Sequence, residues 1–380
     1  MNDKELLGKR IKEERSKLKM SQEDLAKRIG WGSHVQVSTM ENGSRDIKAW
    51  ELAKIANVLK VDISQLMKKV TDGPTESPFV LWRQRPSNAS EVQAEFLKKS
   101  SDYALIERLL KIDSSVKKLP SEKFVIDMIE ESQIYLMADR VREEMALGKF
   151  PAKSLVQTLE DIYGVKFIIK DLMSGAAAIS ISSKLGPCIL LNANDVLWRQ
   201  HYSIAHELFH LITWNEELFK NLEDDPKRAE KNERLAECFA AGLLIPHDVL
   251  VSECEKLKSD SGSLSYVSIV ALARQFEVSA QAMIYRMKSL KILSWKTAEK
   301  ILNDPQFIAL NVMANKARGS TSSLSERLIR ISYQAYTDGK ISGAKLSEIL
   351  DVPLIDLEKT LNNYGLIEDV ENNEIKISHS

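Results

Sequence analysis

Residues 203–214 read SIAHELFHLITW and contain the pattern H-E-x-x-H at His206, Glu207 and His210. An α-helix turns by about 100° per residue, so the two histidines lie one turn apart on the same face. Two imidazoles in this arrangement are placed to bind one zinc ion, and the adjacent glutamate is placed to act as a general base. Because the pattern fixes only three residues, an ordinary buried helix with two histidines is the alternative.

The residues after the motif narrow the kind of zinc site. A metzincin site would require glycine at position 213 and histidine at position 216, where the sequence has Thr213 and Glu216, so that class is excluded. A glutamate on the next helix is the other way to complete the site. That helix offers Glu233 and Glu237, four residues apart and on one face. We assign Glu233 as the third zinc ligand and Glu237 as a hydrogen-bond partner that orients a ligating histidine.

The segments around the motif predict a fold that is mainly α with a small β-sheet. Residues 165–169 and 187–192 read as short strands, with AAAISISS at 176–183 as a third. The H-E-x-x-H helix follows the sheet, and a helix at about 227–244 ends before Pro246. Further helices are predicted at 95–112, at 121–147 and from Pro151 to about Tyr163.

Two motifs resemble the ImmA/IrrE family of zinc metallopeptidases. They are RQHYSIAHELFHLITW at residues 199–214 and ERLAECFAAGLLIP at residues 233–246, and the resemblance covers about residues 135–295. It implies an α+β zincin-like, thermolysin-like domain that binds Zn²⁺. The implied zinc ligands are His206, His210 and Glu233, and the implied catalytic acid/base is Glu207. Glu237 departs from the family motif, in which Asn or Asp is commoner at this position.

The first 67 residues are dense in helical periodicity. Ser21 is an N-cap candidate before an acidic first turn, and Ser33 is placed to cap the next helix, HVQVSTME. That helix ends at Asn42-Gly43, a typical helix stop. Helices at about 47–58 and 62–69 complete a five-helix unit.

This N-terminal pattern resembles the helix-turn-helix domain of XRE-type repressors, although its turn is one residue longer than usual. The resemblance implies that the helix HVQVSTME lies in the major groove of double-stranded operator DNA. A homodimer on a two-fold operator is then expected, while a protein-interaction module of the same shape is the alternative. The candidates for base contacts are Ser33, His34, Gln36 and Thr39, and those for phosphate contacts are Gln22 and Arg45.

Charge and composition agree with a DNA-contacting N-terminus. Residues 1–70 contain 15 Lys and Arg against 10 Asp and Glu, whereas the rest of the chain has 38 against 44. An excess of this size is also common on solvated surfaces. The start of the chain lacks the apolar core of a signal peptide, and no run approaches the about 18 apolar residues of a membrane span. With only three cysteines and no C-x-x-C spacing, we expect a cytoplasmic protein without a membrane segment.

The chain is expected to contain several domains. The predicted order is a DNA-binding domain at 1–70, a linker at 71–94, a peptidase domain at 95–300 and a small helical unit at 320–380. Residues 319–323 read as a second linker, and 267–279 and 342–352 look like further helix-turn-helix units without basic recognition helices. We interpret both as structural supports or as a dimer interface.

These features favour a DNA-binding regulator with a zinc-dependent endopeptidase domain. The family resemblance implies that the substrate is a repressor-like or antitoxin-like helix-turn-helix protein that controls stress or mobile-element genes. The alternative is a non-catalytic repressor or antitoxin that uses the peptidase fold as a sensor or partner-binding body. Intact Glu207 favours catalysis, because a purely structural zinc site does not need that base. The choice of oxyanion stabiliser stays open among His201, Tyr202 and His247.

Overall fold

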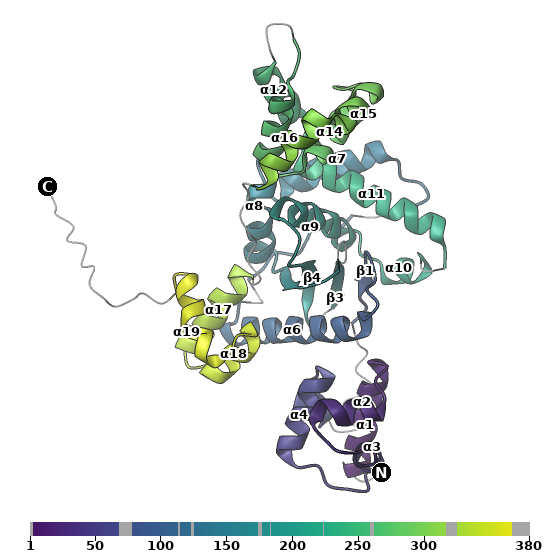
Figure 1. Cartoon of the computed structure of the whole chain (residues 1–380), viewed down its shortest axis with the longest axis vertical. Helices are drawn as coiled ribbons and strands as arrows, with labels where there is room; N and C mark the ends of the chain where they lie inside the picture. The colour runs from purple at the N-terminus through teal and green to yellow at the C-terminus, as the bar shows by residue number, and fades with distance from the viewer. Residues whose placement is uncertain are drawn as a thin grey trace, which may run out of the picture. The chain divides into compact units, whose positions relative to one another are not determined.

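The structure is a computed structural model (Figure 1), and it forms two compact units. One unit comprises residues 1–80 and 84–102, and the other comprises residues 81–83 and 103–380. The described residues are 3–67, 78–112, 115–122, 125–173, 177–182, 184–222, 224–258, 262–316 and 325–366.

The first unit contains the five helices predicted at the N-terminus. They are α1 (Asp3–Lys17), α2 (Gln22–Ile29), α3 (His34–Glu41), α4 (Ala49–Leu59) and α5 (Ile63–Leu66). The caps form as the sequence predicts. Ser21 accepts a hydrogen bond from the Asp24 backbone N–H and completes a capping box, and Ser33 accepts one from the Val35 N–H.

The core of this unit forms where α1, α2, α3 and α4 meet. Ile11, Leu25, Val37 and Ile55 are fully buried there. Gly8 allows the backbones of α1 and α3 to approach closely, because a Cβ atom at this position would clash with the backbone oxygens of the last residues of α3. Tight packing of α1 therefore fixes the position of the helix that the sequence assigns to DNA.

The second unit is built around a four-stranded sheet with the strand order β1-β3-β4-β2. Strand β3 pairs antiparallel with both β1 and β4, and β2 pairs parallel with β4. The strands are β1 (Leu81–Trp82), β2 (Lys166–Lys170), β3 (Ala178–Ser182) and β4 (Gly186–Asn192). The three predicted strands are confirmed, and β1 is an additional edge strand.

Two long helices carry the motif residues beside this sheet (Figure 1). Helix α9 (Leu197–Ile212) packs against β3 and β4, and α11 (Pro226–Leu244) packs against α9 and α7 (Glu131–Glu144). Gly242 permits the close contact between α11 and α7, because a Cβ atom there would lie 2.9 Å from the Tyr135 ring. Among the described residues, no single helix is long and apolar enough to cross a membrane. Helices α11 and α12 (His247–Leu257) meet this length and apolarity only when taken together, and the pair is bent by 54°.

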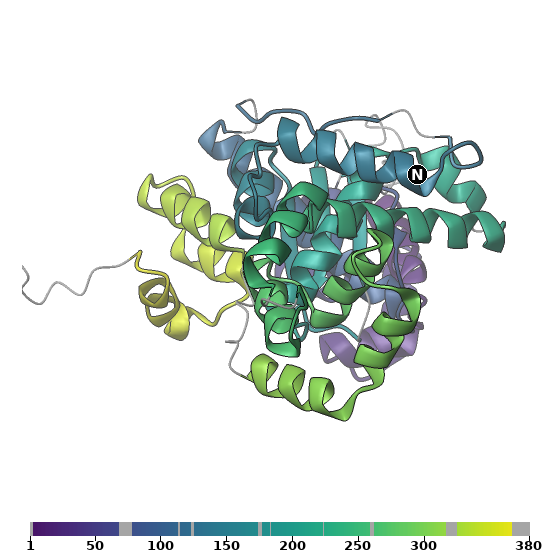
Figure 2. The ribbon, with the colours of Figure 1, turned by 90° about the horizontal axis from the view of Figure 1, so that it is seen from above.

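The remaining helices fall into two further groups, α13–α16 and α17–α19, which Figure 2 shows from above. The first group is α13 (Tyr266–Gln275), α14 (Ala280–Ser289), α15 (Trp295–Asn303) and α16 (Pro305–Lys316). The second is α17 (Glu326–Thr337), α18 (Gly343–Leu350), the 3₁₀ turn η3 (Leu354–Asp356) and α19 (Leu357–Asn363). The other elements are α6 (Ala89–Leu110), α8 (Ala152–Gln157), the π-helix η2 (Thr158–Ile162) and α10 (Glu216–Leu222).

Three predictions about the connecting segments differ from the structure or fall outside it. The helix predicted at 121–147 is limited to α7, because the Glu122 backbone N–H donates to the Ile212 carbonyl and draws that segment toward α9. The predicted linker at 71–94 contains β1 and the start of α6, while residues 71–77 lie outside the described residues. The second predicted linker at 319–323 also lies outside them.

Candidate functional site

The packing of α11 on α9 brings together His206, His210 and Glu233. The two Nε2 atoms of the histidines lie 3.3 Å apart. Glu233 Oε2 lies 3.1 Å from His206 Nε2, and Glu233 Oε1 lies 3.4 Å from His210 Nε2. The sequence placed the histidines one turn apart, and the structure adds that the glutamate reaches both of them.

This triad has the size and chemistry of a zinc site. In a tetrahedral site with bonds of about 2.0–2.1 Å, neighbouring donor atoms lie about 3.3 Å apart. The separation between the two imidazole nitrogens, and the distance from each of them to a Glu233 carboxylate oxygen, match that spacing. Two imidazoles and one carboxylate are also the donor set of catalytic zinc sites that keep a fourth position open. The residues present therefore fit a zinc ion.

The protonation states of His206 and Glu233 suit metal binding. His206 is fully buried, and this burial lowers its pKa to about 4 despite a hydrogen bond with Glu233, so the ring is neutral at pH 7. Burial opposes ionisation of Glu233, but hydrogen bonds with His206 and His210 outweigh it and hold the pKa of this carboxyl below its usual range. A neutral imidazole and an ionised carboxylate are the forms that ligate zinc.

Glu207 lies beside the triad in an unusual environment. Its side chain is buried, and its Oε1 atom has no hydrogen-bond partner among the described residues. Burial raises the pKa of this carboxyl to about 7. Burying a carboxyl without a hydrogen-bond partner destabilises the folded state, and such groups are typical of catalytic sites.

Asn232, rather than Glu237, lies against a ligating histidine. The Asn232 side-chain Nδ2 atom lies 3.4 Å from His210 Nδ1 and is buried, and the Oδ1 atom of the same amide has no hydrogen-bond partner among the described residues. With the amide flipped, Oδ1 accepts the Nδ1 proton that a ligating His210 carries. Glu237 is exposed and contacts neither histidine; its backbone carbonyl accepts a hydrogen bond from Tyr202 instead. The expected orienting role of Glu237 is corrected accordingly, because its side chain points to solvent.

The three residues considered for oxyanion stabilisation have other surroundings. His201 is buried and pairs with Glu277 at 3.3 Å. The Tyr202 hydroxyl donates to the Glu237 carbonyl over 3.2 Å, and burial raises its pKa. His247 is exposed at the start of α12.

Helix α3 presents three of the predicted base-contacting residues to solvent. Ser33, His34 and Gln36 are exposed in its first turn. Thr39 is half-buried, and its hydroxyl donates to the Val35 carbonyl over 3.0 Å. The exposed side chains among the predicted base contacts therefore gather at the N-terminal end of α3, the end with which recognition helices contact bases.

Both residues predicted to contact phosphates have intramolecular partners. The Gln22 amide donates to Glu41 over 2.8 Å, and Glu41 also holds the buried guanidinium of Arg15 at 2.6 Å. The Arg45 guanidinium donates to Glu51 over 3.1 Å and stacks on the Trp31 ring. These bonds stabilise the fold around α3, and the sequence alone gave no sign of the buried acids that form them.

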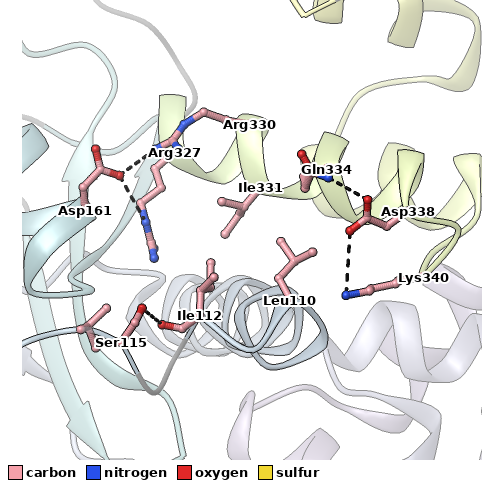
Figure 3. A pocket seen from close by; sticks show the side chains of 11 residues that line it. Leu110, Ile112, Ser115, Asp161, Arg327, Arg330, Ile331, Gln334, Asp338 and Lys340 are labelled. Carbon is pink, nitrogen blue, oxygen red and sulfur yellow. Dashed lines mark hydrogen bonds and ion pairs between the residues drawn. The ribbon is translucent and has the colours of Figure 1, made fainter.

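A cavity of about 520 Å³ lies beside α17 and is lined by none of the three triad residues (Figure 3). Its charged groups pair with one another. Asp161 contacts Arg330 at 2.6 Å and Arg327 at 3.6 Å, and Lys340 donates to the Leu109 carbonyl over 2.8 Å. Because its cations are already paired, this cavity is best understood as part of the contact between α17 and the rest of the unit.

Comparisons with known proteins identify both segments. The family described as "Helix-turn-helix" matches residues 11–66, and the peptidase family described as "IrrE N-terminal-like domain" matches residues 160–288. The second match contains the whole triad and Glu207. The chain is therefore a fusion of an XRE-type helix-turn-helix domain with an ImmA/IrrE-like, metallopeptidase-like domain.

A solved structure described as a "Mycobacterium tuberculosis transcriptional regulator" is similar at 16% sequence identity, with a TM-score of 0.31. The match covers 49% of this chain and 51% of that chain, so it spans about half the length of each. A search of curated proteins finds no significant match.

Proposed function

We propose that the protein is a DNA-binding regulator whose second unit is a zinc-dependent endopeptidase. The observation that carries this proposal is the combination of a zinc-sized triad with a buried, unpaired carboxyl at Glu207. A structural zinc site would need the ligands His206, His210 and Glu233 but not the adjacent base. The family match at residues 160–288 supports the same assignment.

The residues of the site divide the chemistry between them. A zinc ion, when bound by the triad, supplies Lewis-acid polarisation of the scissile carbonyl. Glu207 takes a proton from the attacking water and returns it to the leaving amine nitrogen. Its raised pKa near 7 suits both transfers, because a general acid/base works best when its pKa lies near the operating pH. Asn232 orients the His210 ring from behind.

The first unit directs this activity to DNA. Exposed Gln36 on α3 is suited to bidentate hydrogen bonds with adenine, and Ser33 and His34 lie in the same turn. A single domain of this size makes few base contacts, so a homodimer on a two-fold operator is part of the proposal. The proposed substrate is a helix-turn-helix repressor or antitoxin bound close by, and the proposed compartment is the cytoplasm.

A cleavage assay tests the peptidase. The full chain is incubated with helix-turn-helix proteins encoded beside its gene, with chelator and with zinc restored, and fragments are identified by mass spectrometry. We expect Glu207→Gln to abolish cleavage while keeping bound zinc, and Glu233→Gln to lose both. Glu230→Gln, an exposed change on the same helix, is the matched control and should behave like the wild type.

Two results would contradict the proposal. One is cleavage that persists in zinc-loaded Glu207→Gln protein. The other is normal gene regulation in cells that carry this variant while substitutions in α3 abolish regulation, which would leave the non-catalytic regulator as the function.

A further inference from the structure

Arg83 directly follows β1, the edge strand of the sheet that packs against the helix of the H-E-x-x-H motif. Leu81 and Trp82 pair with Ile179 and Ala178 of β3, and the Arg83 backbone N–H continues this ladder by donating to the Ala177 carbonyl over 3.0 Å. Strand β3 in turn packs against α9, the helix of the H-E-x-x-H motif. Arg83 is therefore fixed by its backbone at the sheet edge next to that helix.

The Arg83 side chain has no partner of its own within the described part of the chain. It is half-exposed, and no hydrogen bond or ion pair engages its guanidinium there. Its charge acts on the helix of the motif. Burial raises the pKa of Tyr202 on α9, the charge of Glu237 adds to this rise, and the positive charge of Arg83 opposes it. Such effects fall off with distance, so they agree with the position that the β1–β3 ladder gives to the guanidinium.

Other arginines on the helices of the site are already paired. Arg199 on α9 contacts Asp195 at 3.5 Å, and on α11 Arg228 contacts Asp127 at 3.0 Å. Arg234 on α11 pairs with Glu131. Arg83 thus differs from its neighbours as a guanidinium available to an external anion. The group that it binds best is a carboxylate, because the two form parallel hydrogen bonds.

We propose that Arg83 binds a carboxylate side chain of the substrate, so that the site prefers peptides with Asp or Glu beside the bond that is cut. This inference rests on the proposed endopeptidase function. It also gives a role to the segment between the two family matches, because Arg83 follows β1 within that segment.

Matched peptides test this preference on the full-length, zinc-loaded protein. Quenched fluorescent peptides that differ only in Glu, Gln or Lys at the positions flanking the central bond are compared by kcat/KM. We expect the wild type to favour Glu over Lys by roughly tenfold, as for one hydrogen-bonded charge pair. Arg83→Gln should remove the preference, Arg83→Glu should reverse it, and Arg83→Lys should keep part of it. Arg85→Gln, an exposed neighbour, is the matched control and should keep all of it.

Binding of the same peptides separates this inference from the peptidase assignment. Fluorescence anisotropy with zinc-loaded Glu207→Gln protein measures their affinity without turnover. Absence of cleavage by the wild type would contradict the proposed function, while the order of affinities would still decide the role of Arg83. The inference would be overturned if Arg83→Gln lowered the affinity for all three peptides equally, or lowered it for none of them.

Discussion

Asn232 lies behind His210, one of the proposed zinc ligands. It is buried, and its amide lies 3.4 Å from Nδ1 of His210, opposite the Nε2 atom that faces the triad. A partner at this nitrogen fixes the ring and raises the basicity of the ligating nitrogen. The neighbouring residue Glu233 is the proposed third ligand, so adjacent positions of α11 contact both histidines of the candidate site.

Replacing this amide should weaken zinc binding without removing a ligand. We expect Asn232→Ala to lower zinc affinity by about 10–100-fold, the usual effect of losing such a partner. Competition with a chromogenic chelator measures the affinity of the full chain. Asn221→Ala, an exposed change on α10, is the control and should leave the affinity unchanged. Equal affinities for Asn232→Ala and the wild type would show that His210 is held by packing alone.

Some residues of the candidate site could be predicted from the sequence and others could not. His206, His210 and Glu233 were predictable because helix geometry fixes the first two and a second motif supplies the third. Glu237 was chosen on its spacing from Glu233, which gives the face of a helix but not the neighbour that this face meets, and Asn232 was not considered. The position of Asn232 directly before the proposed ligand Glu233 was the sequence feature that could have indicated its role. Arg83 was missed because it follows the short run FVLW, which gains its strand character only by pairing with β3.

Gly8 determines how closely α1 and α3 pack. A Cβ atom there would lie 2.6 Å from the Glu41 carbonyl oxygen and closer still to that of Met40, so the two backbones must separate to admit it. We expect Gly8→Ala to destabilise the first unit by about 1–3 kcal/mol and to weaken operator binding by displacing α3. Hydrogen exchange of α1–α4 and DNA titration measure the two effects.

Gly32 provides the matched comparison for this substitution. It lies just before the N-cap of α3, and nothing lies within 4 Å of a Cβ atom built there. Gly32→Ala should therefore leave the protection of the first unit unchanged. If Gly8→Ala were as stable as Gly32→Ala, the close contact of α1 with α3 would not limit the fold.

Helix ends were easier to predict than short strands and tertiary contacts. Ser21 and Ser33 cap their helices through local bonds, which the sequence encodes within three residues. The segment at 121–130 shows the opposite case, because Glu122 bonds to Ile212, a partner that no local pattern can reveal. The partners of Gln22 and Arg45 could not be predicted for the same reason. Glu41, which binds Gln22, is distant in the sequence, and Glu51, which binds Arg45, is buried only on folding.

The C-terminal helices are joined to the rest of the second unit by buried polar contacts between residues that are far apart in the sequence. Arg327 at the start of α17 pairs with buried Glu107 at 2.5 Å, and Lys166 of β2 contacts the same carboxylate at 2.7 Å. Beside them, the Ser325 hydroxyl donates to buried Glu160 of η2. The small helical unit expected at 320–380 is therefore attached by specific charges, although its boundaries stay a prediction.

Glu160 should make this attachment sensitive to pH. Burial raises its pKa from 4.5 to about 7, against the opposing effects of Ser325 and Arg327, while Asp161 and Glu326 add to the rise. The folded form thus keeps a proton that the unfolded form releases, so the contribution to stability is complete below about pH 4.5 and is lost as pH rises through 7. The loss is at most about 3 kcal/mol.

Hydrogen exchange of α17 measures this loss, after correction for the intrinsic effect of pH on exchange. Protection should fall between pH 5 and pH 8 in the wild type and change much less in Glu160→Gln, whose neutral amide cannot ionise. Glu358→Gln, an exposed change on α19, is the control and should follow the wild type. If Glu160→Gln lost protection as steeply as the wild type, another group would set the pH response. Protection that does not change with pH in the wild type would show that Arg327 keeps Glu160 ionised. The attachment of α17 would then rest on an ion pair and not on a neutral hydrogen bond.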